Sequence, residues 1–212
     1  MKKLFVLSLA LCAMSGPVFG QAAGDAPKVK VDLKRVNVGE QGTPDFAAGN
    51  VTLKRWRPKK WMEIDVEFDI KVPQDAGGRN GSYSGLKMNV YVVFNAQTKD
   101  GKFEAAKASL NLSNIPAAET CHALAYISPA SLRSILQKDN FTPADVKGWG
   151  VEFVADGQTV AGDGNPKPTS GNIWWSGPAA EKFAFREGVI LAKSESPFAM
   201  LFGDYDVEAK TK

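Results

Sequence analysis

The composition is that of a chain with enough apolar residues for a hydrophobic core and with almost no net charge. Of its 212 residues, 44% are hydrophobic, and 26 basic residues stand against 23 acidic ones. A formal charge of +3 excludes the broad basic surface that binding to nucleic acid or to an anionic membrane requires. We therefore expect no nucleic-acid partner.

The N-terminus has the three zones of a secretory signal peptide. Lys2 and Lys3 precede an apolar run over residues 4–14, and short side chains before Gln21 indicate cleavage at that point. A run of eleven apolar residues is too short to span a hydrocarbon core about 30 Å thick. The sequence therefore predicts an exported protein, periplasmic or associated with the outer membrane, that does not span the membrane after the leader is removed.

The expected organisation is a signal peptide over residues 1–20, a flexible start over 21–27 and one domain over 28–212. Cys12 leaves with the leader, so Cys121 has no partner for an intrachain disulfide. A domain of this size can be stable on its hydrophobic core alone.

Strand patterns dominate the first two thirds of the chain. The strongest lies at residues 61–72, where apolar side chains alternate with charged ones. Such alternation is typical of a strand with one buried and one solvated face. The other strands expected in this part are residues 28–38, 50–56, 86–96, 109–115 and 120–127.

One short helix is expected next. Ser128 can cap its first turn, Pro129 suits the first helical position, and an apolar stripe runs to about Lys138. A hairpin over residues 149–160 follows, with Asp-Gly at its turn. The last strands expected are residues 173–176 and 182–193.

About eight short strands and one brief helix predict an all-β fold, an immunoglobulin-like β-sandwich. A small β-barrel is the alternative. The mature sequence lacks the two cysteines of a disulfide-pinned immunoglobulin core. The prediction therefore depends on strand patterning alone.

Cys121 and His122 stand side by side, and His122 is the single histidine of the chain. Neighbours on a strand point to opposite faces of the sheet, so the two side chains cannot form a Cys–His nucleophilic pair. We interpret them as a core cysteine beside a surface or edge histidine. One thiol and one imidazole are also too few for a zinc site, and we expect no metal and no cofactor.

Four carboxylates line the polar face of the strand at residues 61–72. Alternate residues lie about 6–7 Å apart, which is within the range of paired glycosidase carboxylates. Four similar acids on a regular strand indicate instead a solvated face, paired with lysines across the sheet; a hydrolase is the alternative. The four are Glu63, Asp65, Glu67 and Asp69. As a calcium site, residues 163–165 offer too few ligands.

Residues 54–61 combine five cations with two tryptophans. The favoured interpretation is a hairpin connection whose basic side chains lie over the sheet edge while the tryptophans enter the core. The alternative is a binding surface for anionic glycans, with indoles adding stacking and cation–π contacts. The candidate contact residues are Arg55, Trp56, Arg57, Lys59, Lys60 and Trp61.

A second tryptophan pair, Trp174 and Trp175, could stack on a sugar ring. Because neighbours alternate in a strand, one indole is expected inside and the other partly exposed.

The apolar stretch at residues 196–202 lies close to the C-terminus. It is expected to close the sandwich as a last strand; otherwise it is an exposed patch that docks a partner. The candidate docking residues are Phe198, Met200, Leu201 and Phe202.

The stretches from Trp56 to Ile64 and from Lys193 to Ala199 resemble a family of exported Verrucomicrobial proteins. One member of that family is encoded in the type IV pilus-like gene cluster of a gut mucin degrader. The resemblance covers essentially the whole mature chain, but its motifs indicate kinship rather than chemistry. It implies an immunoglobulin-like fold and a place in a pilus-associated envelope assembly. The implied partners are envelope or pilus-system proteins, with self-association as an option.

The sequence thus predicts a non-enzymatic envelope protein with no catalytic residues. A filament subunit keeps a long apolar helix after its processing site. Here the apolar run ends before Gly16, and residues 21–27 are small and polar. Within a pilus system, an accessory role is therefore expected, and binding of anionic glycans is the alternative function.

Overall fold

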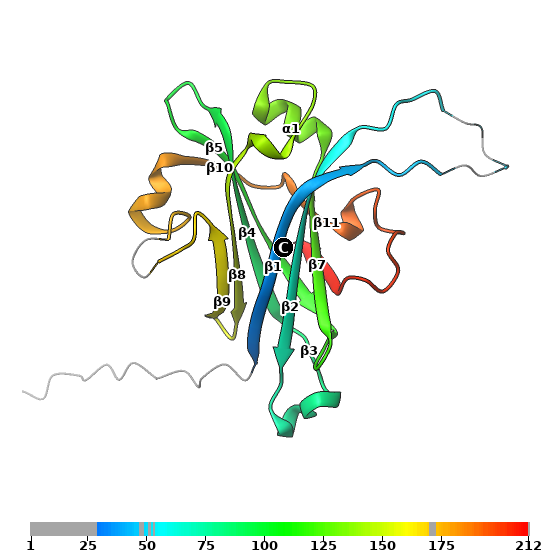
Figure 1. Cartoon of the computed structure of the whole chain (residues 1–212), viewed down its shortest axis with the longest axis vertical. Coiled ribbons are helices and arrows are strands. Elements are labelled where there is room, and N and C mark those ends of the chain that lie inside the picture. Colours follow the sequence, from blue (N-terminus) through cyan, green and yellow to red (C-terminus); the bar gives the residue numbers. More distant parts are fainter. Residues whose placement is uncertain (1–28, 47–48, 51, 53, 170–172, 212) are drawn as a thin grey trace, which may run out of the picture.

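The protein is an all-β sandwich of two open sheets, and the predicted fold class is confirmed (Figure 1). The computed structural model describes residues 29–46, 49–50, 52, 54–169 and 173–211. The expected leader and flexible start lie outside these residues.

The first sheet has the strand order β1-β2-β7-β11 with antiparallel neighbours. Its most regular strand is β2, where five alternate apolar side chains are at most 2% exposed, as the pattern over residues 61–72 predicts. They are Met62, Ile64, Val66, Phe68 and Ile70. The strands of this sheet are β1 (Lys30–Gly42), β2 (Lys60–Lys71), β7 (Thr120–Ile127) and β11 (Ile190–Ala192).

The second sheet has the order β10-β5-β4-β8-β9, and β12 also pairs with β5. Strand β10 is parallel to β5, while the other pairs of this sheet are antiparallel. Its strands are β4 (Leu86–Gln97), β5 (Phe103–Ser113), β8 (Val146–Ala155), β9 (Gln158–Asn165), β10 (Phe183–Arg186) and β12 (Glu208–Thr211). A small ladder joins β3 (Ser82–Tyr83) to β6 (Ile115–Pro116).

The hydrophobic core lies between the two sheets. Phe68 of β2 meets Phe153 of β8 with ring centroids 4.7 Å apart. Cys121 belongs to the same core. Removing this apolar surface from water, at about 25 cal/mol per Å², is the main stabilisation of such a sandwich.

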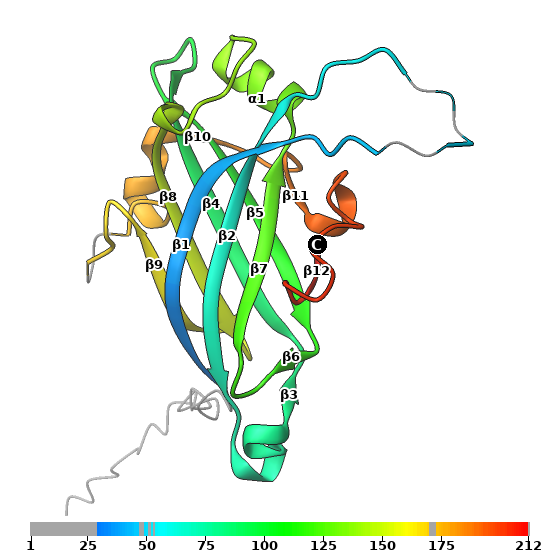
Figure 2. The ribbon, with the colours of Figure 1, turned by 45° about the vertical axis from the view of Figure 1, so that its right-hand side comes forward.

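Helix α1 (Pro129–Leu136) closes one end of the sandwich (Figure 2). It begins as predicted, because the Ser128 hydroxyl accepts a hydrogen bond from the backbone N–H of Ser131 at 3.1 Å. It ends at Gln137, which adopts a left-handed conformation with φ 54°. Leu132 and Ile135 are buried and fix the helix over the core. No helix among the described residues is long and apolar enough to cross a membrane.

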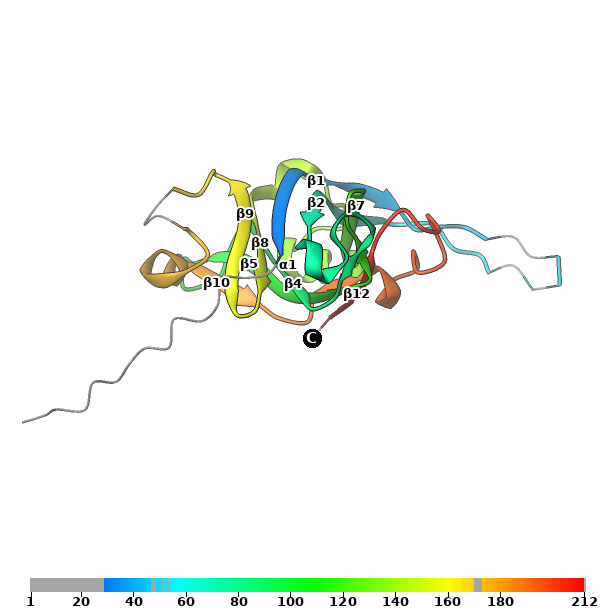
Figure 3. The ribbon, with the colours of Figure 1, turned by 90° about the horizontal axis from the view of Figure 1, so that it is seen from below.

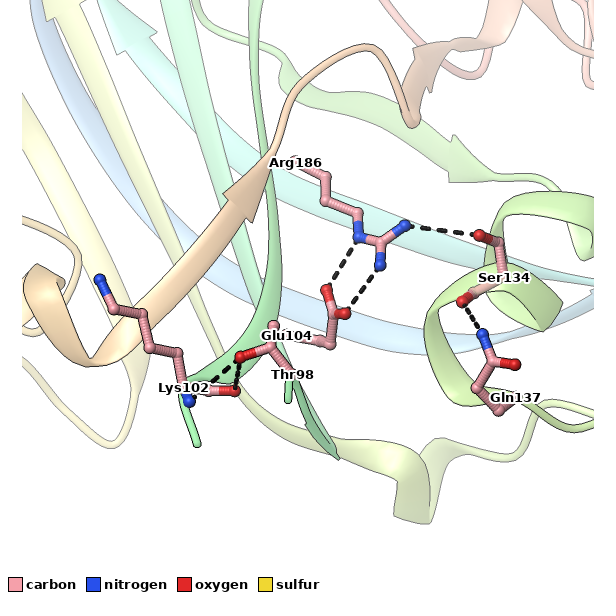
Figure 4. A network of polar contacts seen from close by, with 6 residues as sticks. All are labelled: Thr98, Lys102, Glu104, Ser134, Gln137 and Arg186. Atoms are coloured by element: carbon pink, nitrogen blue, oxygen red, sulfur yellow. Dashed lines mark hydrogen bonds and ion pairs between the residues drawn. The ribbon is translucent and has the colours of Figure 1, made fainter. Parts of the chain in front are cut away.

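A polar network joins helix α1 to the second sheet (Figure 4). The Arg186 guanidinium of β10 donates two hydrogen bonds to Glu104 of β5, at 2.8 and 2.7 Å. It also donates to the Ser134 hydroxyl of α1 at 3.4 Å. Since Glu104 is only 7% exposed, this bidentate pair supplies the partner that a buried carboxylate requires.

Trp174 and Trp175 form an apolar cluster on the outer face of the second sheet, and the prediction of a strand at residues 173–176 is wrong. The described part of this segment is a turn, so the strict alternation of a strand does not apply. Both indoles are buried, with 9% and 6% exposed. The expectation that one of them is partly exposed is therefore also wrong.

Two glycines make room for Trp175. A methyl group at Gly150 would lie 2.4 Å from the indole, and one at Gly164 would lie 2.8 Å from it. The indole also stacks on Tyr91, the cross-strand neighbour of Gly150, with centroids 5.4 Å apart. Any larger residue at Gly150 would displace Trp175 from the sheet.

We predict that Gly150→Ala destabilises the fold by about 1–3 kcal/mol, the usual cost of overpacking. Chemical denaturation followed by tryptophan fluorescence measures the loss. Gly42→Ala is the matched control, because no atom lies within 4 Å of the added methyl group. Equal stability of the two variants would contradict the proposed packing.

Candidate functional site

The connection between β1 and β2 forms an arm, whose described residues, 43–46, 49–50, 52 and 54–59, extend beyond the sandwich (Figures 1 and 2). At its base the Thr43 backbone N–H donates to the Lys59 carbonyl at 2.9 Å. The Thr43 hydroxyl donates to the same carbonyl at 2.8 Å. The two segments of the arm are therefore held together by hydrogen bonds where they leave the sheet.

The described part of residues 50–56 lies in this arm and is not a strand, so that prediction is wrong. The reason is that the described part of the arm lies outside the sheet and pairs with no described strand. Pro44 and Pro58 flank the arm's base. Proline cannot donate a backbone hydrogen bond, so both limit any extension of the β1–β2 ladder.

The arm carries exposed aromatic and cationic side chains. Phe46 is 63% exposed and Trp56 is 46% exposed. Arg55, Arg57 and Lys59 are also exposed, and none of the three forms an ion pair with the described part of the chain. The favoured interpretation, with both tryptophans in the core, is wrong, because Trp56 is exposed on the arm and Trp61 lies half-buried on the outer face of the first sheet.

Lys60 and Trp61 belong to the sheet rather than to the arm. Lys60 pairs with Glu40 across β1 and β2 at 2.6 Å. Trp61 is half-buried on the outer face, where its indole N–H donates to the Thr43 hydroxyl at 3.1 Å. Its ring meets Phe198 edge to face, with centroids 5.7 Å apart. Four of the predicted contact residues therefore lie on the exposed arm, and the other two, Lys60 and Trp61, are held in strand β2 at its base.

Near the C-terminus the chain crosses the outer face of the first sheet. We call residues 196–207 the strap. Its main anchor is Phe198, which is fully buried and stacks on Tyr126 of β7 with centroids 4.4 Å apart. Leu124 and Tyr126 point outward from β7, away from the core, yet are 2% and 0% exposed. The strap is the cover that these two apolar side chains require.

A second anchor lies towards the end of the strap. The Tyr205 ring stacks on His122 at 4.1 Å, and its hydroxyl donates to Asp65 at 2.8 Å. Lys193, just before the strap, forms a nearly buried ion pair with Asp206. The strap is therefore held at both ends by packing and by polar contacts.

The expectation of a last strand at residues 196–202 is wrong, because this part of the strap consists of turns, and the last strand is β12. The candidate docking residues are divided by their exposure. Phe198 is buried and Leu201 is half-buried, whereas Met200 is 88% exposed and Phe202 is 45% exposed.

The carboxylates at the far end of β2 pair across the sheet as expected. Arg35 binds Glu67 at 3.0 Å, and Lys34 binds Asp69 at 3.1 Å, both from β1. These partly exposed ion pairs add little to stability individually. Their position indicates a role in holding the edge strand β1.

The carboxylates at the near end of β2 lie under the strap, so the expectation of a fully solvated face is wrong here. Glu63 accepts a hydrogen bond from the Tyr126 hydroxyl at 2.8 Å. Burial raises the pKa of Glu63, and the Tyr126 hydrogen bond opposes this rise. Asp65 contacts His122 at 2.9 Å and also Tyr205. All four carboxylates of the ladder thus have side-chain partners.

A hollow of about 370 Å³ lies between the strap and the first sheet. We call it the acidic pocket. It lies at the base of the arm, because Gln41 of β1 is part of its wall. Its lining residues are Gln41, Glu63, Asp65, Leu124, Phe202 and Tyr205.

Cys121 and His122 point to opposite faces of β7, as predicted. Cys121 is 3% exposed in the core, and burial raises the pKa of its thiol to about 11. His122 lies beneath Tyr205 rather than on an open surface or edge, and its carbonyl accepts a hydrogen bond from the Val207 backbone at 2.8 Å. The described residues include no group of three or more potential ligands that could hold a metal ion.

These features define an immunoglobulin-like β-sandwich with an extended arm and a covered outer face. A family model matches residues 22–212, and the chain belongs to that family, the Verrucomicrobial family that its sequence resembles.

A solved structure from Akkermansia muciniphila has the same fold, with a TM-score of 0.72 and 21% identity. The match covers 85% of this chain and 93% of that chain. No curated protein matches the chain.

We predict that Phe198→Ala destabilises the protein by about 3–5 kcal/mol, as for a buried phenylalanine elsewhere. Hydrogen exchange of residues 196–207 should also accelerate. The matched control is Met200→Ala in the same strap, which should change stability by less than about 0.5 kcal/mol because Met200 is exposed. Similar effects of both substitutions would contradict the anchoring role of Phe198.

We predict that Cys121 resists thiol reagents in the folded protein. Its thiol has a pKa of about 11, so almost no thiolate exists at pH 8, and the side chain is buried. Labelling with an aromatic disulfide reagent, followed by absorbance, should be complete only in denaturant. The labelling rate of the folded protein should rise with pH towards 11. Rapid labelling at pH 8 would show that the core is open.

Proposed function

We propose that this chain is an exported, non-enzymatic envelope protein that serves as an accessory of a type IV pilus-like system through protein–protein contacts. One observation carries the proposal. Among the described residues, the large apolar side chains that are strongly exposed all lie on the arm or on the strap. They are Phe46, Trp56, Met200, Phe202 and Tyr205.

The arm and the strap lie on the same side of the molecule (Figure 3). Trp61, which follows the arm on β2, contacts Phe198 of the strap, so the two segments meet where the arm leaves the first sheet. Exposed apolar groups concentrated in one region usually mark an interaction site. Tryptophan and arginine, which are adjacent at Trp56 and Arg57, are the residue types that contribute most to protein–protein binding.

The N-terminal sequence supports the export and accessory parts of the proposal. Residues 4–14 match an apolar signal region, and residues 21–27 are small and polar in sequence, unlike the long apolar segment of a filament subunit. The family adds the link to pilus systems, because one member is encoded in a pilus-like gene cluster.

The polar groups of β2 and β7 support a non-catalytic role. The four carboxylates are engaged by other side chains. Cys121 and His122 lie on opposite faces, so neither can activate the other. The contacts of this face hold the strap and strand β1 in place.

A pull-down from envelope fractions tests the proposal. The mature chain should recover pilins, the secretin or the membrane platform, identified by mass spectrometry. A variant with Phe46→Ser, Trp56→Ser and Met200→Ser should recover at least about tenfold less, the loss expected when anchor residues are removed. The replaced side chains are exposed, so circular dichroism should show an unchanged fold.

The matched control is Gln158→Ser, an exposed position at the turn between β8 and β9, which should recover as much as the unaltered chain. Recovery of no pilus or secretion component would contradict the proposal. Equal recovery by the triple variant would remove the role of the arm and the strap.

A second candidate function is the binding of anionic glycans. It is favoured by Trp56, which stands exposed between Arg55 and Arg57. Three of the other tryptophans give it little support, because Trp174 and Trp175 are buried and Trp61 is half-buried. A glycan array should show binding that is lost when Arg55, Arg57, Lys59 and Lys60 are made neutral. Binding by neither protein, or equal binding by both, would exclude it.

A further inference from the structure

The acidic pocket contains two carboxylates that have no Lys or Arg partner among the described residues. Glu63 is bonded to the neutral Tyr126 hydroxyl. Asp65 is bonded to the Tyr205 hydroxyl and to His122, which is charged only when protonated. The rise in the pKa of Glu63, caused first by burial, agrees with a carboxylate that lacks a cation.

Two described cations beside residues of this pocket are already engaged. Arg35 pairs with Glu67 at 3.0 Å, and Lys193 pairs with Asp206. The pocket therefore presents negative charge beside two aromatic side chains, Phe202 and Tyr205. This lining suits a cationic side chain or an indole with cations beside it.

The arm carries the complementary chemistry. Trp56 is exposed, and Arg55 and Arg57 on either side of it form no ion pair with the described residues. Trp56 is three residues beyond the hydrogen-bonded base at Lys59, which allows a reach of about 10 Å.

Within one molecule, none of the described arm residues lines the pocket. Figure 2 shows the arm continuing past the strap into the space beyond the sandwich. The pocket lies back at the arm's base, where Gln41 forms part of its wall. The arm can therefore fill the pocket of a second molecule that approaches from that side.

We propose that two copies of this chain exchange arms, so that Trp56, Arg55 and Arg57 of each copy dock in the acidic pocket of the other. Because each pocket lies at the base of its own arm, reciprocal exchange places both contacts around one two-fold axis and closes the dimer. The proposal rests on the arm as the interaction surface named under the proposed function, and it names a second copy as the occupant of the pocket.

Analytical ultracentrifugation of residues 21–212 tests the self-association. We expect a dimer whose dissociation constant rises with salt, because exposed charges are screened. Arg55→Glu with Arg57→Glu should raise that constant at least about tenfold, equivalent to about 1.4 kcal/mol. Arg79→Glu with Lys102→Glu, both exposed and outside the arm and the pocket, is the matched charge control and should leave it unchanged.

A monomer at all concentrations up to about 1 mM, the weak limit of specific binding, would overturn the proposal. A dimer equally weakened by the control pair would also overturn it, because the effect would then come from net charge alone.

Cysteine cross-linking tests the geometry. Trp56→Cys and Phe202→Cys are made in separate molecules and mixed, and a mixed disulfide between the two copies is expected. Both positions are exposed, whereas the native Cys121 is buried and does not compete. Gln158→Cys replaces Phe202→Cys in the control mixture. Equal cross-linking in both mixtures, or none in either, would overturn the arm exchange.

The experiments can contradict self-association and pilus binding independently of each other. A dimer in the centrifuge together with an empty pull-down would support the arm exchange and contradict the pilus role. Recovery of pilus components by a strictly monomeric protein would support the pilus role and contradict the arm exchange.

Discussion

The stacking of Phe198 on Tyr126 is the contact on which the surface of this protein depends. Strand β7 turns small side chains and Ile127 into the core and turns Leu124 and Tyr126 outward. Leaving these two side chains exposed to water would cost free energy, because apolar surface is more stable when it is buried. The strap covers it, and in doing so it brings Tyr205 over His122 and creates the acidic pocket.

The second sheet meets the same constraint in a different way. Its outer face carries Tyr91, Val93 and Ala105, and the two indoles at residues 174–175 cover them. Gly150 and Gly164 allow the Trp175 ring to approach the backbone. Both sheets are thus covered on the outside by later parts of the chain. The arm is left as the prominent extension with exposed aromatic groups (Figures 1 and 2).

The carboxylates of the first sheet fall into two groups, according to whether the strap covers them. Where β1 and β2 are open to solvent, acids pair with Arg35 and Lys34. Under the strap, Glu63 and Asp65 are bonded to tyrosine hydroxyls and to the one histidine. The strap therefore converts part of an ordinary solvated ladder into a partly buried acidic surface. That surface is complementary to the cations of the arm.

The sequence by itself determined the sandwich, the inward face of β2 and the start of helix α1, because these depend on local periodicity and on the capping by Ser128. It also determined that Cys121 and His122 lie on opposite faces. Only the tertiary structure decided where the strap, the arm and the tryptophan pair lie. The bond between Tyr205 and Asp65 joins residues 140 positions apart, and no local pattern predicts such a contact. The acidic pocket depends on this long-range packing and could not be predicted from the alternation that located its strand.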